Sequence, residues 1–114
     1  MTAPVASAPL HSEEAERSVL GGLMFRPELI GKLPIEVNDF FAMRHQTIWS
    51  AMINLDESGA PVDRTTIVGE IRRSERLGMF GDDEGKALAY LMDLELSCPS
   101  PENAERYVKD ELHR

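Results

Sequence analysis

The sequence predicts an all-α fold, a compact orthogonal bundle of about six short helices. Apolar residues recur at intervals of three and four along the chain. Turns rich in Gly, Pro and Asp separate these periodic stretches, and strand-like alternation of useful length is absent. The 114 residues, 42% hydrophobic and 28% charged, suit one folded domain and argue against a disordered chain.

The domain is expected to comprise residues 12–114, preceded by a flexible tail over residues 1–11 that is rich in Ala and Pro. Ser12 is the expected N-cap of the first helix, because its hydroxyl can accept from an early backbone N–H. The next turns contain three glutamates that complement the helix dipole: Glu13, Glu14 and Glu16. The expected apolar face of this helix consists of Ala15, Val19, Leu20, Leu23 and Met24.

Gly21 and Gly22 lie within the periodic pattern of this first helix. Each glycine costs up to about 1 kcal/mol relative to alanine in a helix interior. Two adjacent glycines therefore suggest that another backbone packs closely against the helix at this point. The alternative is that the helix ends early, at Gly21.

The middle of the chain contains the strongest helical signal. A second short helical stretch is expected to open at Pro27 and to end near Pro34, and Asp39 is a candidate cap for a third element. Ser58 and Gly59 are expected to terminate that element. Its periodic apolar positions are Phe40, Phe41, His45, Ile48, Trp49, Met52, Ile53 and Leu55.

Asp63 is a good N-cap for the next helix. The β-branched residues 65–68 make a strand the local alternative, but the charged run from Glu70 to Arg76 favours a helix. Gly78 and Gly81 then indicate a loop. Met79 and Phe80 within it either fold back into the core or form an exposed apolar patch that contacts a partner.

Two further helices are expected. The acidic residues 82–84 begin the first, which presents Ala87, Leu88, Leu91 and Leu94 and is stopped by Pro99. Ser100–Pro101 is a favoured start for the last helix, since proline suits the first helical position. The apolar face of that helix consists of Ala104, Tyr107, Val108 and Leu112.

The charge balance bears on partners. The formal net charge of −8 disfavours direct binding to duplex DNA, because the phosphate backbone is bound through lysine and arginine. The acidity serves either solubility or a basic protein partner, and the sequence leaves both open. A single cysteine, Cys98, fits a buried residue in a reducing, cytoplasmic setting, without disulfide or cysteine zinc site. Neither a signal peptide nor a run of roughly 18 apolar residues for a membrane helix is present.

Motifs of catalysis are missing from this sequence. It contains no phosphate-binding G-x-x-x-x-G-K-[ST], no G-x-G-x-x-G and no H-E-x-x-H, so neither a cofactor nor a metal is expected. His45 lies on an apolar helical face and is interpreted as a satisfied core histidine. Arg72, Arg73 and Arg76 form a small basic face, either solvated or in contact with a partner.

Several segments together resemble the N-terminal domain of DnaB-type replicative DNA helicases. Glu14–Leu23 is similar to the opening signature of that family, and Asp39–Phe41 with His45 is similar to its next block. Further matching positions are Ile48, Met52, Leu55, Gly59, Pro61–Asp63, Thr66, Tyr90–Leu91, Leu94, Pro99, Asn103 and Tyr107. The order and spacing of these motifs, from roughly Pro9 to Arg114, make the resemblance specific.

The resemblance implies a helical head within the N-terminal collar of a ring hexamer, with other helicase subunits, primase and a helicase loader as partners. It implies that ATP and Mg belong to a separate ATPase domain, and that a helical hairpin follows the head. The matched residues are expected to be structural: Asp63 as a cap, Gly21 and Gly22 as backbone positions, and Ala15, Val19, Leu23, Ile48, Met52, Leu91 and Tyr107 as core. The alternative is a free-standing phage or plasmid adaptor that binds a helicase or primase.

Overall fold

The computed structural model describes residues 12–98 and 100–112. These residues form five α-helices: α1 (Glu13–Phe25), α2 (Met43–Glu57), α3 (Arg64–Arg73), α4 (Glu84–Leu96) and α5 (Ala104–Leu112). Short 3₁₀ helices lie between them at Pro27–Leu29, Val37–Asp39, Leu77–Phe80 and Pro101–Asn103. The described part of the chain contains no β-strand, so the all-α prediction is confirmed. The second predicted helical stretch, after Pro27, is only a 3₁₀ turn.

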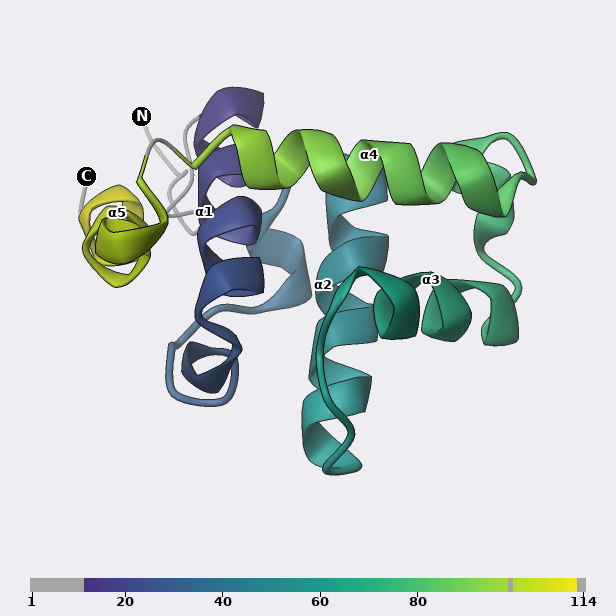
Figure 1. Ribbon diagram of the computed structural model, residues 1–114, viewed down its shortest axis with the longest axis horizontal. Coiled ribbons are helices and arrows are strands. Elements are labelled where there is room, and N and C mark those ends of the chain that lie inside the picture. Colours follow the sequence, from purple (N-terminus) through teal and green to yellow (C-terminus); the bar gives the residue numbers. More distant parts are fainter. Residues whose placement is uncertain (1–11, 99, 113–114) are drawn as a thin grey trace, which may run out of the picture.

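The helices cross one another steeply (Figure 1). In that view α4 runs across the tops of α1 and α2, and α3 lies below the far half of α4. The last helix, α5, is seen end-on beside α1. α1 packs against α4 and α5, while α2 packs against α3, which also contacts α4. This arrangement is the orthogonal bundle that the short helices and brief turns predict.

The glycine pair explains how α1 approaches two other helices. α1 continues through both glycines to Phe25, so the alternative of an early end at Gly21 is wrong. A Cβ on Gly21 would overlap the backbone carbonyl oxygen of Leu94 in α4. A Cβ on Gly22 would lie 2.6 Å from Cγ2 of Val108 and 3.3 Å from the carbonyl oxygen of Ala104, both in α5. The pair therefore provides close contact with two backbones, as the sequence predicts.

The core lies where α1, α2 and α4 meet. Trp49 and Phe40 are its largest fully buried side chains, and their rings pack with centroids 5.9 Å apart. Most of the predicted structural residues are buried there: Ala15, Val19, Leu23, Ile48, Met52 and Leu91. Tyr107 is the exception, since it is only partly buried on α5.

Three of the helix starts follow their local sequence. The side chain of Ser12 accepts from the N–H of Ala15, and that of Asp63 accepts from the N–H of Thr66. The Thr66 hydroxyl oxygen in turn accepts from the N–H of Asp63, which completes a capping box. Residues 65–68 are therefore helical despite their β-branched side chains. Asp83 caps α4 by accepting from Gly85 and Lys86.

The expectation that Asp39 caps the third element is wrong. Its carboxylate accepts from the N–H of Glu36, three residues earlier, and so closes the 3₁₀ turn. The following helix, α2, begins at Met43 after Ala42, which has no side chain able to cap. The donors at this helix end are satisfied by a residue from another helix, described below.

The loop between α3 and α4 folds back onto the core. Phe80 is buried and Met79 is partly buried against the core, which is the first of the two alternatives for this pair. Gly81 and Asp82 have positive φ angles, 76° and 58°, and turn the chain into α4. Pro99, expected to stop α4, lies outside the described residues, as do the predicted tail and the last two residues. α4 itself ends at Leu96.

Replacing Gly21 with alanine should destabilise the protein by at least about 2 kcal/mol, because the new methyl group meets a backbone carbonyl that cannot rotate away. Gly69→Ala is the matched control: Gly69 also lies inside a helix, but its Cβ would meet nothing within 4 Å. That change should stabilise by about 0.5–1 kcal/mol. Urea unfolding followed by circular dichroism measures both, and equal effects would contradict the close approach of α1 and α4.

Candidate interaction surfaces

A buried polar network ties α1, α2 and α4 together. The Glu16 carboxylate, 1% exposed, accepts from Nδ1 of His45 at 2.7 Å. On its other side, Nε2 of His45 lies 2.6 Å from the Tyr90 hydroxyl. Because a carboxylate only accepts, Nδ1 carries the proton toward Glu16, and a neutral ring then accepts from Tyr90 at Nε2. The prediction of a satisfied core histidine at position 45 is confirmed.

Glu16 also satisfies the start of α2. Its two oxygens accept from the backbone N–H groups of Phe41 at 2.6 Å and Ala42 at 3.3 Å. All three predicted glutamates lie in the first turn of α1. Glu13 and Glu14 are exposed, whereas Glu16 is buried and has this further role, which the helix-dipole interpretation does not include. One signal in the sequence points to its burial: Glu16 lies three and four residues before Val19 and Leu20, on the apolar face of α1.

Tyr90 forms the outer edge of this network. Burial raises the pKa of the Tyr90 phenol, and the nearby charges of Arg44 and Arg17 only partly oppose this effect. The Cζ atoms of these arginines lie 4.6 and 5.5 Å from the ring centroid. Phe80 packs against the same ring at 5.8 Å. The phenol stays protonated and serves as a hydrogen-bond donor to His45.

An acid, a histidine and a tyrosine in a row could suggest catalysis, but the geometry is structural. The side chains of Glu16 and His45 are 1% and 0% exposed, so no substrate reaches them. Within residues 12–98 and 100–112, no three His, Cys, Asp or Glu side chains are grouped so that they could hold a metal ion. The Glu16–His45 pair therefore serves to hold α1 and α2 together.

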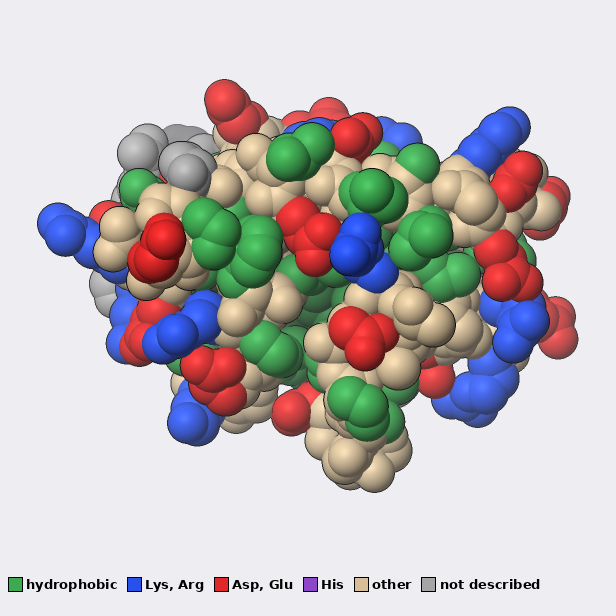
Figure 2. All heavy atoms as spheres, viewed as in Figure 1, with side chains coloured by type: hydrophobic (Ala, Val, Ile, Leu, Met, Phe, Trp, Pro, Cys, Tyr) green, Lys and Arg blue, Asp and Glu red, His purple; other side chains and the backbone are tan. Residues whose placement is uncertain are grey.

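One surface feature is an apolar groove beside the end of α4. It is a hollow of about 470 Å³ lined by Phe25, Met92, Glu95, Leu96, Cys98 and Pro101. Leu96 is 82% exposed and Met92 44%, which is unusual for large apolar side chains in a folded domain. Figure 2 shows hydrophobic side chains gathered between the end of α4 and α5, with acidic groups on either side.

A second exposed apolar pair lies at the start of α2. Phe41 is 93% exposed and Met43 61%, whereas their neighbour Phe40 is buried. The backbone of Phe41 is fixed by Glu16, so this ring projects from a rigid position.

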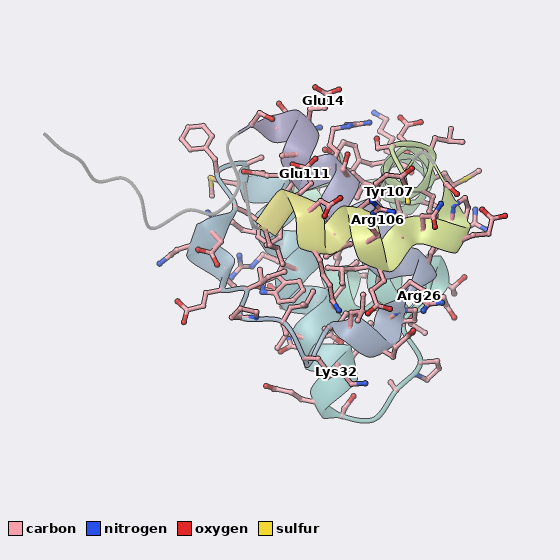
Figure 3. All side chains as sticks on the ribbon, turned by 90° about the vertical axis from the view of Figure 1, so that its left-hand side faces the viewer. Glu14, Arg26, Lys32, Arg106, Tyr107 and Glu111 are labelled. Carbon is pink, nitrogen blue, oxygen red and sulfur yellow. The ribbon has the colours of Figure 1, made fainter. Side chains whose placement is uncertain are left out.

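The outer face of α5 is charged rather than apolar (Figure 3). Glu105 there pairs with Arg26 at 3.3 Å and with Lys109 at 2.9 Å. Arg106 lies 4.0 Å from Asp110. The partly buried Tyr107 lies beside Arg106 on this helix, as Figure 3 shows. Because opposite charges pair along this face, it offers no field of a single sign to a partner.

The arginines predicted as a basic face are only partly available. Arg73 donates two hydrogen bonds to Glu70, and Arg72 lies 3.3 Å from Glu84. Arg76 is exposed next to a small polar hollow on α2 and α3. Phe80, being buried, has little surface to offer a partner, and Met79 only part of its side chain. Contact of a partner with these three arginines or with Met79 and Phe80 stays a prediction.

Comparison with known proteins identifies the family to which this domain belongs. The family model described as "DnaB-like helicase N terminal domain" matches residues 8–110. The chain belongs to this family. It is similar to the N-terminal domain of DnaB helicase from Mycobacterium tuberculosis, with a TM-score of 0.71 and 29% identity over 92% of this chain and 72% of that one. The buried core and the glycine contacts described above are thus those of a DnaB-like N-terminal domain.

Relatives of this DnaB-like domain are much longer proteins. The chain is 36% identical over 104 residues to "Replicative DNA helicase DnaC" from Bacillus subtilis strain 168, covering 89% of this chain and 22% of that protein. It is 34% identical over 103 residues to "Replicative DNA helicase DnaB" from Geobacillus stearothermophilus, with the same coverages. The chain thus spans about a fifth of the length of the curated relatives it matches. None of the described helices is long and apolar enough to cross a membrane.

Truncation of Glu16 tests the buried network. Glu16→Ala should destabilise the protein by about 2–4 kcal/mol, because it leaves buried donors of His45 and the α2 start without an acceptor. Glu14→Ala, an exposed position in the same helix, should change stability by less than about 0.5 kcal/mol. The unfolding free energy in urea measures both, and a small effect of Glu16→Ala would show that the network is not formed.

Glu70 provides a test by pH. Hydrogen bonds from Arg73 hold the pKa of the Glu70 carboxyl below its usual value of 4.5, with a smaller contribution from Asn54 in α2. A lowered folded pKa stabilises the fold above the usual carboxyl pKa, and this contribution disappears as the pH falls through the lowered value. Glu70→Gln should therefore lower the free energy of unfolding at pH 7. The loss should be under about 1 kcal/mol, because Arg73 is 74% exposed, and it should become progressively smaller below pH 4.5.

Urea unfolding between pH 7 and pH 2.5 measures this difference. Glu57→Gln, at an exposed carboxylate on α2, is the control and should stay within about 0.5 kcal/mol of the unmodified protein throughout. A Glu70→Gln deficit that is constant with pH would show that the carboxylate charge contributes nothing.

Proposed function

We propose that this chain is the N-terminal collar domain of a hexameric replicative DNA helicase, where it organises the ring and binds primase and the helicase loader. The observation that carries this proposal is the family match over residues 8–110, together with relatives whose names are replicative helicases. The domain itself performs no catalysis. ATP and Mg are used by a separate ATPase domain of the parent protein, which acts in the cytoplasm.

The surface of the domain supports an interaction role. Its two exposed apolar sites, at Leu96 and at Phe41, resemble the anchors from which protein interfaces are built. The net charge of −8 makes duplex DNA a poor ligand and favours protein partners. The only polar cluster that resembles a catalytic site among the described residues is sealed inside the fold. A rigid domain with exposed apolar side chains on its surface is suited to an N-terminal collar that binds other proteins.

Deletion in the complete reading frame tests this proposal. The whole protein should sediment as a hexamer, hydrolyse ATP and bind the primase of the same organism. Removal of residues 1–114 should leave ATP hydrolysis in place. Because the collar contacts are lost, it should lower the affinity for primase at least about tenfold or lower the fraction of protein that sediments as a hexamer by a similar factor. Sedimentation velocity and interferometry with immobilised primase measure these quantities.

Two results would contradict the proposal. One is a deletion variant with unchanged assembly and unchanged affinity for primase and loader. The other is a reading frame that contains no ATPase domain, in which case the protein would act as a free-standing adaptor that binds a helicase or primase.

A further inference from the structure

The groove at the end of α4 has the spacing of a helix-binding surface. Leu88, Met92 and Leu96 succeed one another every four residues, so they lie on one face of α4, roughly 6 Å apart along the helix axis. All three are exposed, at 37%, 44% and 82%. The stripe is therefore about 12 Å long and corresponds to two turns of a partner helix.

The groove has an apolar floor and wall. Phe25, at the end of α1, forms one side and is 37% exposed. Cys98 also lines the groove and is buried, and this burial raises the pKa of its thiol, which stays neutral. Pro101 lines it as well. Phe25, Met92 and Leu96 lie on α1 and α4, whose buried faces form part of the core, so this part of the groove is present without a partner.

The rim of the groove is acidic. Glu95 lines it but already pairs with Arg64 at 3.5 Å. Asp93 follows Met92 on α4 and is exposed, and Glu102 follows Pro101 and lines an adjoining polar hollow. Neither carboxylate forms an ion pair within the described part of the chain. The hydrogen bond from Ser100 lowers the pKa of the Glu102 carboxyl, which is ionised at neutral pH. Three basic residues line the same adjoining hollow as Glu102, namely Arg26, Arg106 and Lys109, and each pairs with another carboxylate.

We propose that this groove is the docking site for an amphipathic helix of a partner protein, one whose apolar stripe is flanked by lysine or arginine. The apolar side chains of that helix would pack between Phe25, Met92 and Leu96. Its basic flank would face Asp93 and Glu102. The proposal rests on the function proposed above in taking the domain as an interaction module, and it adds the chemistry of one partner and the place where that partner binds.

A second copy of this chain fits the groove less well. Two such grooves placed face to face would bring the Asp93 and Glu102 carboxylates of both copies together, and like charges across an interface are unfavourable. The net charge of −8 on each copy adds to this repulsion. A basic helix removes the repulsion and supplies the opposite charge at the same time.

A designed peptide pair tests the proposal. The probe is a fluorescein-labelled helical peptide with leucines at every third or fourth position and lysines on both flanks, and the matched peptide carries glutamate at each lysine position. The lysine peptide should bind this chain at least about tenfold more tightly than the glutamate peptide, and its affinity should fall as salt is raised. Fluorescence anisotropy measures both affinities.

Two variants locate the binding. Leu96→Glu should lower the affinity for the lysine peptide at least about tenfold, because it replaces the most exposed apolar side chain of the groove with a charged one that cannot pack against the leucines of the peptide. Val37→Glu is the control, since it makes the same kind of change at an exposed apolar residue outside the groove, and it should leave the affinity unchanged. The double variant Asp93→Lys with Glu102→Lys should reverse the preference toward the glutamate peptide.

Three results would overturn the proposal: equal binding of the two peptides, equal effects of Leu96→Glu and Val37→Glu, or self-association of the unmodified chain that Leu96→Glu abolishes. These outcomes are separable from the deletion experiment above. A collar domain whose removal weakens primase binding, but whose groove ignores the peptides, would keep its proposed function and lose this binding site.

Discussion

Contact between the α1 backbone and two neighbouring helices is the constraint on which the rest of this fold depends. Gly21 faces the Leu94 carbonyl of α4, and Gly22 faces Val108 and Ala104 of α5. At Gly21 no side chain separates α1 from α4, so their relative positions are set by backbone atoms, which have little freedom to adjust, whereas at Gly22 a methyl group of Val108 and the Ala104 carbonyl both lie against α1. The position of α4 in turn fixes where its exposed stripe and the groove beside α5 lie.

The buried Glu16 carboxylate fixes a second pair of helices. It accepts hydrogen bonds from His45 and from two backbone N–H groups at the start of α2, and it thereby holds α2 against α1. A buried carboxylate of this kind is costly unless every acceptor site is used. The network thus specifies one arrangement of the helices, while Trp49 and Phe40 supply the apolar burial around it.

Local signals predicted the helices, the glycine contact and the Asp63 cap, because each depends on residues close together in the sequence. The network was missed because Glu16 meets partners 25, 26 and 29 residues away. The groove was missed for a different reason. α4 has leucine or methionine at positions 88, 91, 92, 94 and 96, so periodicity alone cannot tell its buried side from its exposed one. Leu88 belongs to the same predicted pattern as Ala87, Leu91 and Leu94, but it is 37% exposed whereas those three are buried.

The most direct test of the backbone contact is a nuclear Overhauser measurement on the folded protein in solution. Strong cross-peaks are predicted between the α protons of Gly21 and those of Glu95, and between the α protons of Gly22 and the methyl groups of Val108. Both sets of cross-peaks together would place α1 against α4 and α5 as described. A folded, helical protein that lacks them would contradict the arrangement on which the core, the network and the groove all depend.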